Sequence, residues 1–558
     1  MRKFLIAVVL FPLIILSGCK GKEGEELLRD FISKKSAQLQ KLESEVNLAD
    51  WNAATSGSKE AYAKLEEAKN RLTTFLSSKR DFEFLKKWMK KEGKIKDPLI
   101  RRQLEILYNY YLPNQGDPDL MKNINKLETE IARKFSVYRA KIDGKEYSMN
   151  DIDEILKTSK DDMLRKKAWE AQKAVGREIK AQLLELVKLR NKLAGSLGFK
   201  NYYEMKLKID EMDPEALFEI LDRVAEITDG PFARLKEKID REIGRVRNKK
   251  PESLMPWDYE DPFFQEAPAV FKVNLDQFYK GKNIPELALS YYDSIGIDLH
   301  DVIKRSDLFE RPGKNPHAFE IDINRAGDVR VLLNIKDNEY WMSTTLHELG
   351  HAAYSKYIDQ TDLPYLLRRE AHMFTTEAVA MFFEDMTKNP RWMVAVLNVK
   401  PEDIKPYTES MREFVAAKAL IFARWSMVMT HFERDLYANP DQDLNALWWK
   451  YKEKYQLLKK PAGRNEPDWA SKIHIALYPV YYHNYMLGSL LACQFYHYLV
   501  TNVYGGNSDV SFADEPEIGK FFIEKVFYPG SKYRWDDMIK EATGEPLNVK
   551  YFVERFLK

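Results

Sequence analysis

His347-Glu348-Leu349-Gly350-His351 is the stretch of this 558-residue chain that predicts the most about its fold and chemistry. On an α-helix, residues i and i+4 share a face, so His347 and His351 would present two imidazoles to one point in space. Two neutral imidazoles on one helical face suit Zn²⁺, and Glu348 is placed to act as a base on a metal-bound water. We therefore expect a metal-binding helix that holds one zinc ion as cofactor.

The helix that carries this motif is expected to end near Tyr357, before a break at Asp362-Leu363-Pro364. A catalytic zinc usually takes three protein ligands and keeps one position for water. The downstream third histidine of some HExxH enzymes is absent, which leaves a carboxylate on the next predicted helix, roughly Leu366 to Met386. The candidates lie seven residues apart: Glu370, Glu377 and Glu384. We favour Glu377, because the small residues beside it would let two helices approach closely.

Upstream of the motif, the segment from His317 to Ile335 has the pattern of strands. Alternating apolar residues flank an Ala326-Gly327-Asp328 turn, which predicts a β-hairpin. An exposed strand edge beside the zinc helix could hold an extended peptide across the metal. Elsewhere apolar residues recur at three- and four-residue spacing, so we expect a mostly α protein with one small sheet.

Composition narrows the possible partners. The chain has 88 Lys and Arg residues against 86 Asp and Glu residues, a formal net charge of +2. No basic block is interleaved with aromatic residues, so nucleic acid is not an expected partner. The many aromatic residues favour a well-packed interior over disorder.

Several pieces along the chain resemble the angiotensin-converting-enzyme-like M2 family of zinc dipeptidyl carboxypeptidases. They are Ala168-Trp169-Glu170, Val175-Gly176, Leu189-Arg190-Asn191, Gly198-Phe199, His317-Ala318, the zinc motif with Asp362-Leu363-Pro364 and Thr376-Glu377-Ala378, Trp448-Trp449, Lys472-Ile473-His474-Ile475 and Tyr482-His483-Asn484-Tyr485. Their order and spacing together carry the resemblance. It implies a large helical metallopeptidase of two lobes around a deep central cleft, with the small sheet beside the zinc helix.

The resemblance also implies roles in catalysis. The zinc ligands would be His347, His351 and Glu377. Glu348 would act as general base on the zinc-bound water and then pass a proton to the leaving amine. Tyr485 would donate a hydrogen bond to the oxyanion, and His474 would support the intermediate.

Four further residues would bind the substrate, which we expect to be a short peptide. His317 and Ala318 would bind its main chain, and Lys472 and Tyr482 would hold its C-terminal carboxylate. Such a clamp implies release of C-terminal dipeptides. Each of these residues taken alone could instead be an ordinary packed or surface residue.

The chain also departs from the family pattern. The carboxylate-binding glutamine of the family has no clear counterpart near Met255-Pro256-Trp257-Asp258-Tyr259. Asn484 and Lys452 stand where chloride-dependent members carry arginines, so chloride is not an expected cofactor. Met381 stands where the family has an aspartate behind the zinc site, a position that Glu384 or another group could fill.

One segment differs in length. The stretch between His474 and Tyr482 is one residue longer than in the family, which leaves the choice between Tyr482 and Tyr481 for the carboxylate open. Two other functions also stay open. The same residues would serve a broader oligopeptidase of the M3 type, or the scaffold could be a non-catalytic surface protein that binds peptides. The intact Glu348 argues against a pure binder.

The N-terminus has the pattern of a secretory signal, with Arg2-Lys3 before an apolar stretch from Phe4 to Leu16 that is too short to span a membrane comfortably. Leu16-Ser17-Gly18-Cys19 resembles a bacterial lipobox, and an ordinary signal peptide is the alternative. We expect a signal peptide at 1–18, a tether at 19–26 and one two-lobed peptidase domain at 27–558. The protein would be a monomer, lipid-anchored at Cys19 in the bacterial cell envelope and facing the periplasm or exterior. Only Cys493 would remain free, so no intrachain disulfide is expected.

Overall fold

The computed structural model describes residues 24–271 and 273–557, which form a mostly helical protein as predicted. The predicted signal segment and Cys19 lie outside the described residues. The first helices are α1 (Glu25–Ser56), α2 (Lys59–Leu76), α3 (Lys79–Met89), α4 (Pro98–Tyr111), α5 (Pro118–Val137), α6 (Met149–Thr158), α7 (Asp162–Lys173), α8 (Val175–Ser196), α9 (Tyr202–Ile209) and α10 (Pro214–Arg247). Within the described ranges, none of the helices combines the length and the apolar character that a membrane crossing needs.

The rest of the chain is also largely helical. The α-helices that follow are α11 (Asp276–Tyr279), α12 (Ile284–Ser294), α13 (His300–Arg305), α14 (Glu339–Tyr357), α15 (Met373–Glu384), α16 (Pro390–Leu397), α17 (Pro401–Ile404), α18 (Thr408–Ala438), α19 (Leu444–Gln456), α20 (Ile473–Leu477), α21 (His483–Asn502), α22 (Pro516–Phe521), α23 (Trp535–Thr543) and α24 (Lys550–Phe556). Shorter helical turns include η4 (Pro256–Asp258), η6 (Tyr365–Leu367), η9 (Asp468–Ser471) and the π-helix η10 (Phe522–Phe527).

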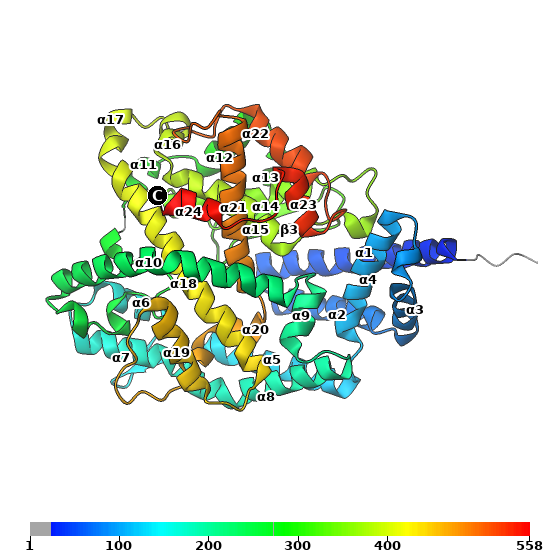
Figure 1. Cartoon of the computed structure of the whole chain (residues 1–558), viewed down its shortest axis with the longest axis horizontal. Helices are drawn as coiled ribbons and strands as arrows, with labels where there is room; N and C mark the ends of the chain where they lie inside the picture. Colours follow the sequence, from blue (N-terminus) through cyan, green and yellow to red (C-terminus); the bar gives the residue numbers. More distant parts are fainter. Residues whose placement is uncertain (1–23, 272, 558) are drawn as a thin grey trace, which may run out of the picture.

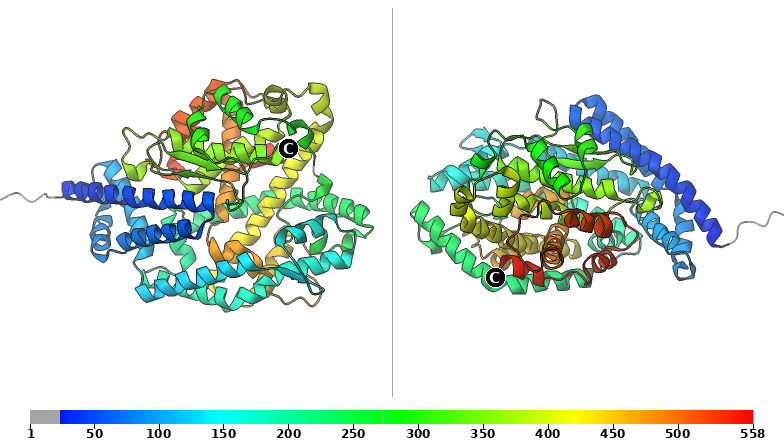
Figure 2. Two further views of the ribbon diagram at one scale, coloured as in Figure 1. Left: turned by 180° about the vertical axis from the view of Figure 1, so that it is seen from behind. Right: turned by 90° about the horizontal axis from the view of Figure 1, so that it is seen from above.

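The helices gather into two groups. Figure 1 shows α12–α16 and α22–α24 in one group and α5–α8 and α19 in the other. The long helices α18 and α21 run through both groups. Helices α1 and α2 pack against each other on the outside of the molecule, as Figure 2 also shows, and α1 contacts α4 and β3. This arrangement fits the two lobes expected from the sequence, while the boundaries of the predicted domain stay a prediction.

The main hydrophobic core extends through both groups of helices. Its largest fully buried side chains are tryptophans from widely separated segments, namely Trp169, Trp392, Trp425, Trp448 and Trp469. Burying one such side chain removes about 150–250 Å² of surface from water, so these residues contribute strongly to the packing of the helices.

The predicted β-hairpin is confirmed, although its strands are short. β3 (Phe319–Asp322) pairs antiparallel with β4 (Val329–Leu332), with Phe319 opposite Leu332. The prediction of a single sheet was wrong, because β1 (Ala140–Ile142) pairs with β2 (Lys145–Tyr147) in a second hairpin. Its two-residue turn is Asp143-Gly144, both with positive φ, which is the turn that brings two strands together most directly.

α15 packs between α14 and α21, and two glycines permit this close packing. A Cβ atom added at Gly350 of α14 would lie 3.0 Å from the Cα of Ala380 on α15. A Cβ atom added at Gly488 of α21 would lie 3.2 Å from the Cβ of Glu377. Small residues therefore bring the backbone around Glu377 against both neighbouring helices, as the sequence predicted for α14 and α15.

The helix predictions around the motif are correct at one boundary and wrong at another. α14 ends at Tyr357, as predicted. α15 begins at Met373 and not near Leu366, because η6 and a bend separate it from the Asp362-Leu363-Pro364 break. His372 caps α15 by accepting a hydrogen bond from the backbone N–H of Phe374.

Candidate metallopeptidase site

The three expected zinc ligands meet between α14 and α15. The Nε2 atoms of His347 and His351 lie 3.2 Å apart, and the Nε2 atom of His347 lies 3.8 Å from a carboxylate oxygen of Glu377. All three ligand atoms lie within 4.8 Å of one another. Tetrahedral zinc, with bonds of about 2.0–2.2 Å, needs ligand atoms about 3.3 Å apart, so this donor set fits one zinc ion.

Both histidines are oriented through their other ring nitrogen. The Nδ1 atom of His347 lies 2.7 Å from the carboxylate of Glu384, and the Nδ1 atom of His351 lies 2.7 Å from the hydroxyl of Thr376. Such partners fix the ring and the tautomer so that Nε2 is free to bind metal. Glu384 therefore occupies the place behind the zinc site that Met381 cannot fill.

Glu384 is held in its ionised form. Burial alone would raise the pKa of Glu384, but the Lys418 ammonium and the hydrogen bond with His347 together hold its pKa well below the ordinary value. The distance between the Lys418 Nζ atom and the carboxylate is 3.4 Å. An ionised carboxylate behind His347 makes the imidazole a better metal ligand.

Glu348 lies between the two histidines in sequence and is 8% exposed. Burial raises the pKa of Glu348 to about 7; His347 opposes this shift, while the Glu377 carboxylate adds to it. A carboxyl group whose pKa lies near neutral pH can both take and give a proton. Its carboxylate also accepts a hydrogen bond from the backbone N–H of Glu320 on β3.

The hairpin thus brings one strand edge to the metal site. β3 pairs with β4 along one side, and the backbone N–H of Glu320 points away from β4 toward Glu348. Ala318 is half-buried and comes immediately before the strand. His317 is exposed, and its backbone N–H donates to the side chain of Asn315. An extended peptide could therefore pair with this edge beside the expected base.

Tyr481 and Tyr485 lie beside the metal ligand Glu377, and His474 lies beside Tyr482. The hydroxyl of Tyr481 is hydrogen-bonded to Glu377 and to Tyr485. The Tyr481 and Tyr485 rings are 5.2 Å apart. The ring of His474 lies 5.1 Å from that of Tyr482, and burial, with help from Lys472, lowers the pKa of His474 to about 4. His474 is therefore neutral at physiological pH, and its buried Nδ1 atom has no partner within the described residues.

The lysine and tyrosine expected to hold a carboxylate lie together, and a glutamine joins them. The Nζ atom of Lys472 donates to the Gln265 side-chain oxygen at 2.7 Å, and the Tyr482 hydroxyl lies 3.4 Å from the same oxygen. Trp425 donates its indole N–H to the Tyr482 hydroxyl at 2.7 Å. We call Gln265, Lys472 and Tyr482 the carboxylate clamp.

The sequence offers no clear counterpart of the family's carboxylate-binding glutamine near Met255–Tyr259. Six residues past Tyr259, Gln265 lies against Lys472 and is a candidate for that role. Tyr482 lies in the carboxylate clamp and Tyr481 at the metal ligands, so two adjacent residues face different parts of the site. The sequence offers Tyr481 only as an alternative to Tyr482 for the carboxylate, and it does not predict the position of Tyr481 beside Glu377.

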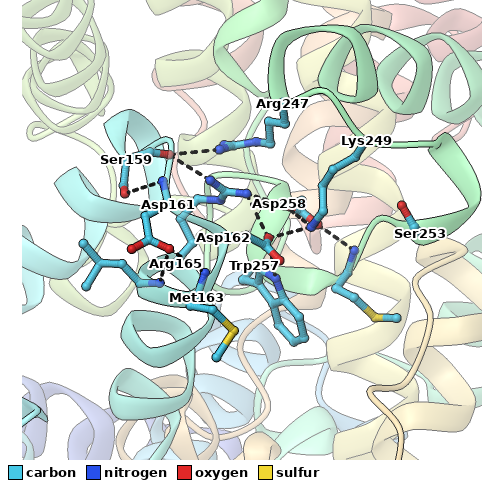
Figure 3. Close-up of polar contacts among 12 residues, drawn as sticks. Ser159, Asp161, Asp162, Met163, Arg165, Arg247, Lys249, Ser253, Trp257 and Asp258 are labelled. Atoms are coloured by element: carbon cyan, nitrogen blue, oxygen red, sulfur yellow. Dashed lines mark hydrogen bonds and ion pairs between the residues drawn. The ribbon is translucent and has the colours of Figure 1, made fainter.

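A buried ion-pair network anchors the loop that leads to Gln265. Figure 3 shows Arg165 and Lys249 converging on Asp258, whose carboxylate also accepts the backbone N–H of Met255. Arg165 is 1% exposed and Asp258 is completely buried. The network ties η4 to α7 and to the residues after α10. It therefore limits the positions that the following loop can adopt.

The same loop is held further along by backbone contacts. The Trp169 indole N–H donates to the carbonyl of Pro262 at 3.0 Å, and the Lys452 ammonium donates to the carbonyl of Phe263 at 2.6 Å. The Asp261 carboxylate accepts the backbone N–H of Gln265 at 3.0 Å. Gln265 is thus positioned by a chain of buried contacts, although its loop lacks regular secondary structure.

Lys452 and Lys173 line a small enclosed cavity beside this loop, with a volume of about 10 Å³. Burial lowers the pKa of Lys452 to about 7 and lowers that of Lys173 well below the ordinary value. Asn484, at the position of the other family arginine, is 2% exposed. These positions do not test the prediction that chloride is not a cofactor.

Comparison with known proteins agrees with this geometry. The sequence model of peptidase family M3 matches residues 155–557, a range that contains all the residues of the metal site and the carboxylate clamp. The model described as angiotensin-converting enzyme, of family M2, matches residues 22–228.

Individual relatives include an angiotensin-converting enzyme and two carboxypeptidases. The angiotensin-converting enzyme of Theromyzon tessulatum is 23% identical over 547 residues, covering 90% of this chain and 86% of that protein. Carboxypeptidase 1 of Bacillus subtilis is 24% identical over 482 residues, covering 82% and 85%. Thermostable carboxypeptidase 1 of Pyrococcus furiosus is 23% identical over 501 residues, covering 83% and 91%.

Proposed function

We propose, from the premise that this chain belongs to peptidase family M3, that it shortens peptides from their C-terminal end and releases dipeptides. That the protein is a zinc metallopeptidase of the M2/M3 group follows from the family matches and the His-His-Glu site. The observation that carries the finer proposal is the carboxylate clamp, in which Lys472, Gln265 and Tyr482 converge. A buried ammonium beside a tyrosine hydroxyl and an amide is suited to a free carboxylate.

In the proposed reaction, the metal ligands and Glu348 have separate roles. His347, His351 and Glu377 would hold Zn²⁺, which supplies Lewis-acid chemistry when bound. Glu348 takes a proton from the attacking water as its oxygen bonds to the peptide carbonyl carbon. It then delivers that proton to the amide nitrogen as the C–N bond breaks.

Other side chains stabilise the charge that develops. The Tyr485 hydroxyl is placed to donate a hydrogen bond to the carbonyl oxygen as it becomes negative. Neutral His474 can bind the peptide without adding a positive charge. The carboxylate clamp fixes the C-terminus, which sets the peptide bond that lies against Glu348.

Two other specificities compete with dipeptide release. The match to family M3 favours a broader oligopeptidase, and the two carboxypeptidase relatives suggest removal of single C-terminal residues. All three use the same metal site and differ in how the peptide end is held. A non-catalytic peptide-binding role is the remaining alternative, although Glu348, the expected base, is present.

Product analysis separates these possibilities. A free-acid peptide and its C-terminally amidated twin are incubated with the zinc-loaded protein, and the fragments are identified by mass spectrometry. We expect C-terminal dipeptides from the free acid and little cleavage of the amide. Equal cleavage of both would favour a general oligopeptidase, release of single residues would favour a carboxypeptidase, and no cleavage at all would favour the binding role.

The cellular location is also a proposal. The lipobox-like Leu16-Ser17-Gly18-Cys19 supports a lipid anchor in the bacterial cell envelope, with the enzyme facing the periplasm or exterior. Metabolic labelling with a radioactive fatty acid tests this, because a Cys19→Ser variant should lose the label. Labelling that persists in the variant, or is absent from the unaltered protein, would contradict it.

A further inference from the structure

The residues between α20 and α21, which we call the α20–α21 loop (residues 478–482), carry three tyrosines. Tyr481 and Tyr482 already have places in the site, at the metal ligands and in the carboxylate clamp. Tyr478 does not, and it is 57% exposed although its neighbours are largely buried. An exposed aromatic side chain within a catalytic segment calls for an explanation, because its ring offers apolar area that is not buried by the protein itself.

Tyr478 borders the part of the site where the scissile carbonyl must lie. Its ring is 5.6 Å from the ring of His474, which also contacts Tyr482 on the side of the carboxylate clamp. Tyr478 is close enough to Tyr485 to add, after burial and the Glu377 carboxylate, to the raised pKa of that hydroxyl. Tyr478 is thus near the expected oxyanion donor, whereas the ammonium of Lys472 lies near Tyr482.

The backbone is held by buried hydrogen bonds on both sides of Tyr478. Arg190 donates to the carbonyl of Ala476 at 2.9 Å, and Glu433 accepts the backbone N–H of Val480 at 2.8 Å. Val480 has a φ of 59°, a conformation that is strained for a β-branched residue, and it is 1% exposed. Strain of this kind persists only where surrounding contacts enforce it. The exposed position of Tyr478 is therefore set by buried contacts.

We propose that Tyr478 is a specificity-determining residue that receives the substrate side chain on the N-terminal side of the scissile bond and favours an aromatic group there. The proposal rests on the proposed function and assigns a preference to the same site. The carbonyl under attack belongs to that substrate residue, so a ring that contacts His474 and lies within electrostatic range of Tyr485 would meet its side chain. Offset or edge-to-face packing of two rings then buries the exposed face of Tyr478.

The test compares two free-acid tetrapeptides that differ only at the second position, which precedes the bond cut in dipeptide release. One carries Phe there and the other Ala. We expect the zinc-loaded protein to prefer the Phe peptide by at least about tenfold in kcat/KM. Tyr478→Ala should reduce this preference to below about threefold, mainly by slowing the Phe peptide, whereas Tyr478→Phe should keep it. Tyr62→Ala, which removes an exposed tyrosine of α2, is the matched control.

Binding to an inactive enzyme separates this proposal from the proposed function. In a Glu348→Gln background, the Phe peptide should bind about tenfold more tightly than the Ala peptide, and adding Tyr478→Ala should abolish the difference. A preference that survives Tyr478→Ala in kinetics and binding would overturn the role of Tyr478. A second Phe–Ala pair that differs only at the third position tests the assigned side, and a larger preference there that Tyr478→Ala abolishes would overturn it. Failure of the unaltered protein to cleave any peptide would contradict the proposed function alone, because the binding comparison would still decide the role of Tyr478.

Discussion

Replacing Lys472 by methionine would remove a buried ammonium from the carboxylate clamp while keeping a side chain of similar length. Lys472 is 8% exposed, and burial lowers its pKa from 10.5 to about 8. That change corresponds to about 3 kcal/mol of free energy that disfavours the charged form in the folded protein. Lys472→Met should therefore stabilise the free protein at neutral pH by up to about 3 kcal/mol.

The effect on activity should have the opposite sign. A hydrogen bond between a buried ammonium and a substrate carboxylate is worth about 2–4 kcal/mol. Its loss should lower kcat/KM for a free-acid peptide by roughly 30- to 1000-fold. The amidated twin, which presents no carboxylate, should change by less than about threefold. Gain of stability together with loss of one class of substrate is the signature of a binding residue that is unfavourable for folding.

The pH dependence of activity and stability follows from the lowered pKa of Lys472. Lys472 loses its proton in the free enzyme near pH 8, so kcat/KM for the free-acid peptide should fall as the pH rises above about 8. The folded-state pKa lies below that of the unfolded chain. The free-energy cost of burying the charged Lys472 is therefore complete below pH 8, decreases between about pH 8 and 10.5, and is absent above that range. The stability difference between Lys472→Met and the unaltered protein should decrease in the same window.

Steady-state kinetics on the peptide pair and urea denaturation at pH 7 and pH 9.5 measure both effects. Lys188→Met is a suitable control, since that lysine is half exposed and pairs with Asp441 on the surface. Equal loss of activity toward the free acid and the amide would refute the clamp. Loss of stability in Lys472→Met at pH 7 would refute the account of its burial.

Three further predictions concern other parts of the site. Glu348→Gln should lower kcat by about 10²–10⁴-fold while metal analysis still finds one zinc per chain, and loss of the metal would contradict a purely catalytic role. Glu384→Ala should weaken zinc affinity about 10- to 100-fold in a chelator competition assay, since His347 would lose its orienting carboxylate; unchanged affinity would rule this out. Asp258→Ala should cost about 3–5 kcal/mol in urea denaturation because the buried Arg165 and the half-buried Lys249 each lose one of their two carboxylate partners, whereas the exposed Asp441→Ala should cost less than about 1 kcal/mol.

The local part of this fold could be predicted because it depends on residues close in sequence. The four-residue spacing of His347 and His351 is a property of one helix, and the end of α14 at Tyr357 follows from the break just beyond it. The prediction of the hairpin before the motif depends on alternating apolar residues and on a turn sequence between them. The hairpin at 140–147 has the same kind of signal in Asp143-Gly144, but its three-residue strands are too short to stand out among helical segments.

The carboxylate clamp depends on tertiary structure, which explains why one of its members was missed. Gln265 and Lys472 are separated by 207 positions, and no helical or strand periodicity relates them. The position of Gln265 is determined by the buried pairs around Asp258 and by Lys452 on a distant helix. Such contacts leave no pattern in the sequence, so the position of Gln265 beside Lys472 could not be predicted from it.

The assignment of Tyr481 and Tyr482 could not be made for a different reason. The extra residue before them shifts the register by one position, and adjacent side chains then exchange their surroundings. Only the backbone decides which tyrosine faces which group, and here the positive φ of Val480 does so. Positive φ at a valine is rare enough that sequence alone would not suggest it.

The position of Tyr482 at the start of α21 fixes its distance from Tyr485, which lies three residues further along the same helix. In the proposed function, Tyr482 would hold the peptide end and Tyr485 would face the bond to be cut, and their rings are 5.4 Å apart. Three helical residues advance only about 4.5 Å, and this rise is among the least variable lengths in a protein. The interval between the anchored end of a substrate and its cleavage point would therefore be set within one helix, independently of any motion between the two groups of helices. Changing the number of residues released would require rebuilding the first turn of α21, rather than altering the metal site.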